Sequence, residues 1–156
     1  MKNDDKARIG SVAPNFTLKD DQGRDWRLFD HRGRVVVLLF YPGDDTRVCT
    51  RQMRSLRNHW QEYVETGAEV VGISTDDMLS HQRFITKYGL PVKLLSDPAR
   101  AVVDLFGAQS LIPGKVARSV FVIDANGIIR HRDVHPIGLI RPKDSDILQA
   151  IRAAQH

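Results

Sequence analysis

Cysteine is almost absent from this sequence, because Cys49 is the only one in 156 residues. A single thiol cannot form an internal disulfide, and a lone cysteine in a chain without an export signal is compatible with a reducing compartment. Cys49 is therefore an inert core residue, an intermolecular link or a nucleophile. Considered without its neighbours, the inert interpretation is the default, because free cysteine is among the most buried residue types.

Long apolar runs are also missing. No stretch approaches the roughly 20 consecutive apolar residues that a membrane-spanning helix needs. The first residues, Met1 to Arg8, are polar and charged and no apolar region follows them, so we expect neither a secretory signal nor a membrane anchor. The sequence thus predicts a soluble protein of the cytoplasm.

Charge of one sign is not concentrated anywhere. Lys and Arg number 23 and Asp and Glu number 19, which gives a modest formal net charge of +4. Basic residues occur along most of the chain, without the dense block or the interleaved aromatic residues that mark a nucleic-acid surface. We therefore expect no nucleic-acid partner.

The strands can be predicted from apolar runs. The length and the 42% hydrophobic content fit one globular domain over residues 1–156. Residues 35–41 are continuously apolar and rich in β-branched side chains, which is typical of a strand covered on both faces. Further strands are predicted over 69–74, 93–95, 119–124 and 128–131, after an N-terminal hairpin with arms at 16–18 and 26–28. The pair Asn126-Gly127 predicts a type I′ turn.

The helices follow from apolar periodicity and from end signals. They are predicted over residues 47–66, 76–88, 98–106 and 144–153. Strands alternate with helices and then give way to a hairpin. This order indicates an α/β fold with a mixed central sheet and helices on both faces.

Cys49 lies at a special place in this pattern. Pro42 and Gly43 end the apolar strand, and Thr46 is an N-cap candidate, so Cys49 becomes the third residue of the next helix. Backbone N–H groups have no carbonyl partner there and the helix dipole is positive, which stabilises a thiolate, the reactive form of cysteine. The end of a central strand is also where open α/β sheets usually build sites. The nucleophile interpretation is therefore favoured over the inert one.

Charged residues on both sides of Cys49 act in opposite senses. Three arginines lie within five positions of it and two aspartates come just before it: Arg47, Arg51, Arg54, Asp44 and Asp45. The arginines stabilise a thiolate, and the aspartates oppose it. The balance depends on side-chain directions that the sequence does not specify.

The residues around Cys49 resemble the active-site motif of the peroxiredoxins, with Pro42, Thr46 four residues on and Cys49 three further on. In the bacterioferritin comigratory protein, or peroxiredoxin Q, branch, this cysteine is followed by Thr and, two residues later, by Gln. Thr50 and Gln52 stand at these places, so the segment most resembles that branch. Flanking segments resemble that branch in order and approximate spacing: 9–18, 71–75, 94–97 and 118–124. The resemblance runs from about residue 9 to about residue 152 and implies a thioredoxin-like fold.

The resemblance also implies roles for five residues. Cys49 would be the peroxidatic thiolate, the Thr46 hydroxyl would bind the peroxide, and Pro42 would shield the site from water. Arg118 would polarise the peroxide and favour the thiolate, and Gln52 would support Arg118. From the residues alone, plainer roles stay open. Thr46 could act only as an N-cap and Pro42 only as a strand terminator, and the other two could be surface residues.

The proposed reaction leaves a sulfenic acid, which must meet a second thiol, and this chain has none. Arg54 and Val103 stand where the resembling branch often carries a resolving cysteine. The resemblance therefore implies a one-cysteine peroxidase that reduces hydrogen peroxide and organic hydroperoxides, as a monomer or homodimer. The resolving thiol would come from outside the chain: thioredoxin, glutaredoxin with glutathione, a small thiol, or Cys49 of another subunit. The alternative is a non-enzymatic redox sensor on the same fold, whose Cys49 relays oxidation as a mixed disulfide.

Other chemical motifs are weak. His131 and His135 flank Asp133, but we expect strand spacing to place only some of them on one face, so no metal site is predicted. Neither a nucleophile elbow nor a glycine-rich phosphate loop occurs. We expect no cofactor.

Overall fold

The computed structural model describes residues 7–136 and 142–156, so most of the polar segment from Met1 to Arg8 lies outside it. Within these residues, one mixed sheet has seven strands in the order β2-β1-β5-β4-β3-β6-β7. The strands are Thr17–Asp20 (β1), Asp25–Arg27 (β2), Val36–Phe40 (β3), Glu69–Ser74 (β4), Lys93–Ser96 (β5), Arg118–Ile123 (β6) and Ile129–His135 (β7). β4 runs parallel to β3 and β5, whereas β6 is antiparallel to β3. The predicted N-terminal hairpin, β1 and β2, joins the sheet beside β5.

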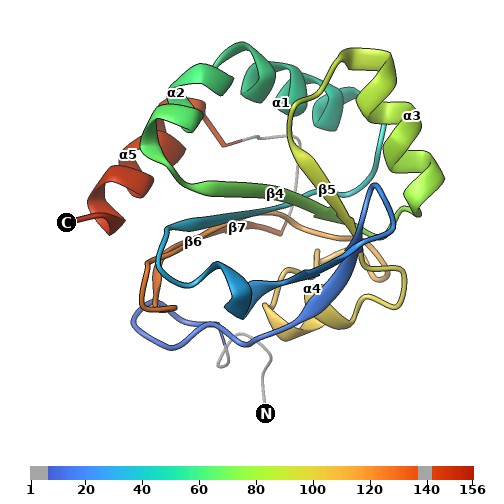
Figure 1. Ribbon diagram of the computed structural model, residues 1–156. Helices are drawn as coiled ribbons and strands as arrows, with labels where there is room; N and C mark the ends of the chain where they lie inside the picture. Colours follow the sequence, from blue (N-terminus) through green and yellow to red (C-terminus); the bar gives the residue numbers. More distant parts are fainter. Residues whose placement is uncertain (1–6, 137–141) are drawn as a thin grey trace.

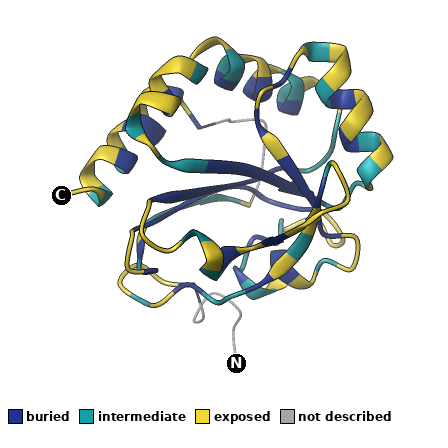
Figure 2. Ribbon diagram, in the orientation of Figure 1, coloured by how far each residue is buried: buried dark blue, intermediate teal, exposed yellow. Residues whose placement is uncertain are grey.

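Helices cover both faces of the sheet (Figure 1). They are Arg47–Asn58 (α1), Trp60–Thr66 (α2), Met78–Tyr88 (α3), Ala101–Leu105 (α4) and Asp144–Ala154 (α5), with a 3₁₀ turn at Leu28–His31. α1, α2, α3 and α5 lie on one face, which we call the site face, and α4 lies on the other, which we call the aromatic face. In Figure 2 the strands are mostly buried, whereas the outer sides of the helices are exposed.

β3 explains why two separate cores form. Its side chains alternate, so Val36, Leu38 and Phe40 join the aromatic-face core, while Val37 and Leu39 join the site-face core. All five are buried. A continuously apolar strand is therefore required, as the sequence predicts.

Two helix predictions need correction. The helix predicted over 47–66 is broken at His59, which has φ −108° and ψ 12°. The imidazole Nδ1 of His59 lies 2.9 Å from the Ser55 carbonyl oxygen and so competes with the backbone for that acceptor. The helix predicted from residue 98 begins only at Ala101, because Arg100 has a left-handed backbone with φ 61°, which an α-helix cannot contain.

The turn between β6 and β7 is not of the predicted type I′. Only Gly127 of the Asn126-Gly127 pair has a positive φ, 83°, whereas type I′ requires it at both residues. The loop instead has three residues, and it is closed by hydrogen bonds from the Gly127 amide to the Asp124 carbonyl and from the Asp124 amide to the Ile128 carbonyl, both 2.9 Å. A left-handed glycine at the end of a three-residue loop is the usual alternative hairpin connection.

The α/β fold class, the mixed sheet and the helices on both faces are confirmed. β7 is longer than predicted, because it pairs with β6 along its whole length, from Ile129 to His135. Among the described residues, none of the helices combines the length and the apolar character that a membrane span requires.

Candidate active site

Cys49 lies in the first turn of α1, just beyond the end of β3. Thr46 has the extended backbone of an N-cap residue, with φ −82° and ψ 159°, and Cys49 is the third helical residue. The Thr50 amide makes a 2.8 Å hydrogen bond to the Thr46 carbonyl, one turn back. The amide of Cys49 comes before this bond, among those that have no acceptor within the helix. The predicted helix-start position of the thiol is therefore confirmed.

Arg118 touches the sulfur directly. Its Nη1 donates a hydrogen bond to the Sγ of Cys49 at 3.1 Å. The sheet brings the two residues together, because β6 is antiparallel to β3 and Phe40, the last residue of β3, pairs with Ser119. Arg118 therefore stands beside the loop that follows β3. The plainer interpretation of Arg118 as a solvated surface cation is wrong, because only 5% of it is exposed.

The positive charge of the buried Arg118 side chain requires a negatively charged partner. Across residues 7–136 and 142–156, no carboxylate forms an ion pair with this guanidinium. A buried cation without a counter-charge is strongly unfavourable. The sulfur of Cys49, itself fully buried, is the group in reach that can carry a negative charge. The Arg118 guanidinium is therefore placed to stabilise a thiolate at Cys49.

Gln52 is also part of this site. It is 4% exposed, so the default surface interpretation is wrong, and its Oε1 accepts a 3.2 Å hydrogen bond from the same Nη1 of Arg118. The support of Arg118 that the resemblance implies is present in the structure. Two buried donors, Gln52 Nε2 and Arg118 Nε, have no partner among the described residues. They leave hydrogen-bonding capacity for an oxygen atom near the sulfur.

Thr46 does not make the predicted capping hydrogen bond. Its hydroxyl instead donates to the carbonyl oxygen of Gly43 at 3.0 Å, and Thr46 itself is exposed. Its oxygen still has lone pairs that can accept a hydrogen bond from a ligand. Pro42, half-buried, lies directly after the end of β3 and Tyr41. Both residues thus lie in the loop that precedes Cys49.

The two aspartates before Cys49 point to α3. Asp44 Oδ2 lies 2.7 Å from the Nδ1 of His81. Asp45 Oδ2 accepts a hydrogen bond from Lys87 Nζ at 2.8 Å, and hydrogen bonds from Lys87 and Tyr88 hold the pKa of the Asp45 carboxyl below its usual value. Each aspartate therefore has a basic partner on α3. Sequence reasoning missed these partners, although a histidine on the buried side of a predicted amphipathic helix is a signal for them.

The other arginines near Cys49 do not share the contact of Arg118 with the sulfur. Arg47, Arg51 and Arg54 are all exposed on α1, so water screens their charges. Arg54 and Val103 occupy the two places where a resolving cysteine would be expected. Val103 is fully buried on the aromatic face, across the sheet from Cys49.

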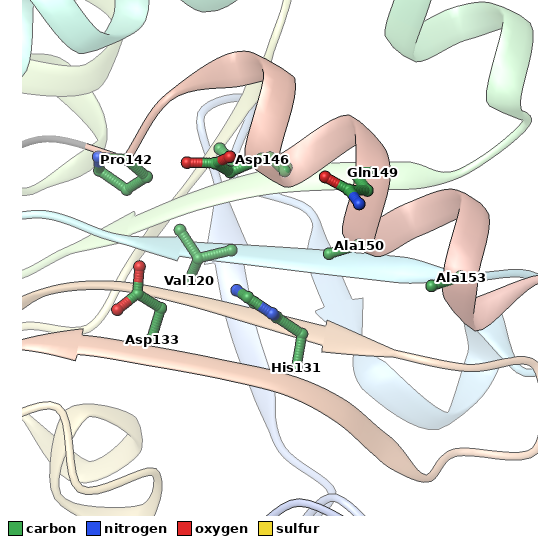
Figure 3. A pocket seen from close by; sticks show the side chains of 9 residues that line it. Val120, His131, Asp133, Pro142, Asp146, Gln149, Ala150 and Ala153 are labelled. Atoms are coloured by element: carbon green, nitrogen blue, oxygen red, sulfur yellow. The ribbon is translucent and has the colours of Figure 1, made fainter.

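A separate hollow lies between β7 and α5 (Figure 3). His131 and Asp133 both point into it, and Asp133 Oδ2 lies 3.0 Å from His135 Nε2. The expectation that strand spacing separates these three residues is therefore wrong, because alternate residues share one face of a strand. Within the described part of the chain, no three His, Cys, Asp or Glu side chains form a group that could hold a metal ion.

Comparison with known proteins agrees with this geometry. The AhpC/TSA family model matches residues 9–132. Peroxiredoxin Q of Oryza sativa subsp. japonica, a chloroplast protein, is 44% identical over 133 residues, in a match that covers 81% of this chain and 58% of that protein. The chain thus spans 58% of the length of this curated relative.

Solved structures show the same fold. The peroxidoxin BcpB of Mycobacterium tuberculosis superposes with a TM-score of 0.85 and 28% identity, covering 96% of this chain and 99% of that one. Peroxiredoxin Q of Xanthomonas campestris gives a TM-score of 0.81 at 24% identity, covering 96% and 98%. The thioredoxin-like fold is therefore confirmed. With its motif, fold and relatives in agreement, the chain belongs to the AhpC/TSA family of peroxiredoxins, on the peroxiredoxin Q branch.

Proposed function

We propose that this protein is a thiol-dependent peroxidase. The Cys49 thiolate attacks one oxygen of a hydroperoxide, the S–O bond forms as the O–O bond breaks, and the other oxygen leaves with the electron pair and takes a proton. The peroxide is reduced to water or an alcohol, and the sulfur is oxidised to a sulfenic acid. A first external thiol then condenses with the sulfenic acid to a mixed disulfide and releases water. A second thiol group of the reductant attacks that disulfide, which returns Cys49 to the thiolate and leaves the reductant as its own disulfide.

The contact between Arg118 and Cys49 is the observation that carries this proposal. A guanidinium at 3.1 Å favours the thiolate before the reaction. It has further N–H donors that can reach the oxygen on which negative charge develops as the O–O bond breaks. Donors aimed at developing charge in a buried site are the largest single source of rate acceleration in many enzymes. One arginine can therefore serve both the nucleophile and the leaving group.

The substrate and the reductant are proposed from the relatives and from the cysteine count. Hydrogen peroxide and organic hydroperoxides are the proposed substrates, because the relatives are peroxiredoxins. The reductant is a thiol from outside this chain, since Cys49 is its only cysteine. Thioredoxin, glutaredoxin with glutathione and a small thiol stay equal candidates. The cytoplasmic location, the single domain over 1–156, the lack of a nucleic-acid partner and the monomeric or dimeric state also stay predictions.

The decisive test measures peroxide consumption by the purified protein with each reductant in turn, and follows Cys49 oxidation by stopped-flow fluorescence. Trp60 on α2 packs against the site-face core and provides a signal. We expect rapid oxidation by one equivalent of peroxide and sustained turnover with at least one reductant. Oxidation without turnover in any of the three reductant systems would contradict the peroxidase proposal.

A further inference from the structure

His81 is a fully buried ionisable side chain near the active-site loop that the proposed reaction does not use. It lies on α3 with no exposed surface. Its Nδ1 is 2.7 Å from Asp44 Oδ2, and its Nε2 is 3.0 Å from the carbonyl oxygen of Leu95 on β5. Each ring nitrogen therefore faces an oxygen that accepts hydrogen bonds.

This arrangement determines the charge of His81. A neutral imidazole has one N–H, so one of its nitrogens would face an acceptor without a proton. A proton on Asp44 could fill that gap, but Asp44 already receives hydrogen bonds from Tyr41 Oη at 2.6 Å and from Ser80 Oγ at 2.8 Å. Burial first, and Asp44 second, raise the pKa of Tyr41 well above its usual value, so the phenol keeps its proton. Two donors already around one carboxyl group favour a carboxylate, and both ring nitrogens of His81 are then placed to donate.

Asp44 belongs to the loop that carries Thr46 to the site. The Asp44 amide donates to Asp76 Oδ2 at 2.7 Å, so both the backbone and the side chain of Asp44 are fixed. The next residue, Asp45, has a left-handed backbone with φ 56°, which is costly for a residue with a side chain. Hydrogen bonds from Lys87 and Tyr88, at 2.8 and 2.7 Å, hold Asp45 from the side of α3. α3 therefore anchors the loop at both aspartates.

We propose that His81 is a positioning residue of the peroxidase site, a buried imidazolium that fixes residues 42–46 and cancels the negative charge of Asp44, five residues before Cys49 in the chain. The inference rests on the proposed function for its effect on rate. Among the described residues, the ionisable groups in contact with His81 are Asp44 from the loop and Tyr41, which directly follows β3. The Ser80 hydroxyl of α3 donates to Asp44 and does not titrate in this range. From β5 the ring meets a backbone carbonyl, which does not titrate.

The charge state can be measured directly in the unchanged protein. Two-dimensional ¹⁵N–¹H spectra of the imidazole rings distinguish an imidazolium, with protons on both nitrogens, from either neutral tautomer. His81→Asn identifies the signal by its loss. We expect two protonated ring nitrogens in His81 at pH 7, protected from exchange. One protonated nitrogen at that pH would overturn the proposal, whatever the variants do.

The effect on the site is measured with His81→Asn and with His131→Asn as the matched control, since His131 lies on β7. The side-chain amide of Asn can still donate to Asp44 but carries no charge. We expect the rate constant for peroxide oxidation to fall about 10- to 100-fold in His81→Asn, because small misplacements of reacting groups cost that much. The control should stay within about twofold of the parent.

The third measurement is the pH dependence of Cys49 alkylation, which a purely structural role of His81 would leave unchanged. With the charge of Asp44 no longer cancelled, the midpoint should move about 0.5 to 1 pH unit upward in His81→Asn. It should return towards the parent in Asp44→Asn/His81→Asn, because the pair is then neutral. An unmoved midpoint would contradict the charge-cancelling role.

The two proposals fail in different ways. If the unchanged protein does not turn over peroxide, the proposed function is wrong, while the spectra and the alkylation profile still test His81. If the protein turns over peroxide and His81→Asn matches it in rate and profile, the inference about His81 is wrong. If His81→Asn does not fold, His81→Gln replaces it, because its amide can reach the Leu95 carbonyl as the ring Nε2 does.

Discussion

The two faces of the sheet are packed by different means. On the aromatic face, Phe106 lies 5.2 Å from Phe121, 5.6 Å from Phe16 and 5.8 Å from Phe40, measured between ring centroids. On the site face the core under α1, α3 and α5 surrounds Cys49 and includes aromatic hydroxyl groups, such as that of Tyr41. The aromatic face thus gains stability from ring contacts, which add to the burial of apolar area.

The site face contains polar groups that stability alone does not require. Arg118, Gln52 and His81 are all at least nine-tenths buried there, and a buried charge is often less favourable than an apolar side chain of the same volume. The comparison teaches that this fold separates its tasks. Both faces hold an apolar core, but most ring contacts lie on the aromatic face, and the groups that support the chemistry lie on the site face. Substitutions on the two faces should therefore affect different measurements.

Cys49→Ser tests the centre of the site face and should have the largest effect on peroxide reduction. A hydroxyl cannot replace the thiolate as a nucleophile at neutral pH, so peroxide reduction should be abolished. The thermal midpoint should stay close to that of the parent, because serine is nearly isosteric and Arg118 can still donate to it. Peroxide turnover by this variant with a thiol reductant would show that the redox centre has been misidentified.

Phe106→Ala tests the aromatic face. Phe106 is fully buried and contacts three other rings, so its loss should lower the free energy of unfolding by about 3–5 kcal/mol. Urea denaturation measures this change, and Phe106→Leu, which keeps most of the volume, is the control with a smaller loss. The rate constant for Cys49 oxidation, measured where the variant is folded, should change by less than about threefold. A large loss of rate would show that the two faces are coupled.

Arg118→Met tests whether the buried cation acts on the transition state. Removing a charge-assisted contact made mainly in the transition state should cost about 2–4 kcal/mol, or about 30- to 1000-fold in the oxidation rate constant. The rate is measured at a pH where alkylation shows Cys49 to be fully ionised in both proteins. Arg51→Met is the control, because Arg51 is exposed on α1. Recovery of the parent rate at high pH would limit Arg118 to favouring the thiolate.

Replacing Asp124 should have the smallest effect of these substitutions. The quantity affected is the free energy of unfolding, and the effect depends on pH. Burial alone would raise the pKa of Asp124, but hydrogen bonds from the Ile128 amide, from Arg130 and from the Asn126 amide outweigh it and hold the pKa below the usual value. The stabilisation is therefore present above pH 3.8, the ordinary value, and is lost as the pH falls through the lower folded value.

Asp124→Asn should accordingly lower the free energy of unfolding at pH 7 by about 1–2 kcal/mol. The difference from the parent should shrink as acid protonates Asp124. Asp25→Asn is the control, since its ion pair with Lys19 is exposed and should contribute less than about 1 kcal/mol. A difference between Asp124→Asn and the parent that stays constant down to pH 2 would contradict the assignment of the carboxylate charge.

Most of the fold could be predicted from the sequence because its signals are local. The apolar run that forms β3 and the glycine that ends α3, Gly89 with φ 61°, are properties of a few adjacent residues. The break at His59 could not be predicted, because it involves Asp144, which lies 3.4 Å away and far along the chain. The turn at Gly127 was predicted in place but not in type, since Asp124 accepts two of its amides.

The site was predicted in part for the same reason. Cys49 and Thr46 follow from a local motif, whereas the burial of Gln52 and the contact of Arg118 with the sulfur depend on how β6 pairs with β3. Only the family resemblance named Arg118. His81 escaped prediction, because its partners come from distant parts of the chain: Asp44 from the loop before α1 and Leu95 from β5.

The contact between Cys49 and Arg118 joins residues that are 69 positions apart, and this separation affects synthesis and folding. Closing such a long loop is among the slower events of folding, since its entropic cost is met before the contact forms. A nascent chain that has emerged from the ribosome as far as β5 already contains the thiol but not the arginine. Its Cys49 then behaves as an ordinary cysteine towards peroxide. We therefore expect the proposed rapid oxidation of Cys49 only in the completed fold, so that its onset during refolding would report when β6 docks against β3.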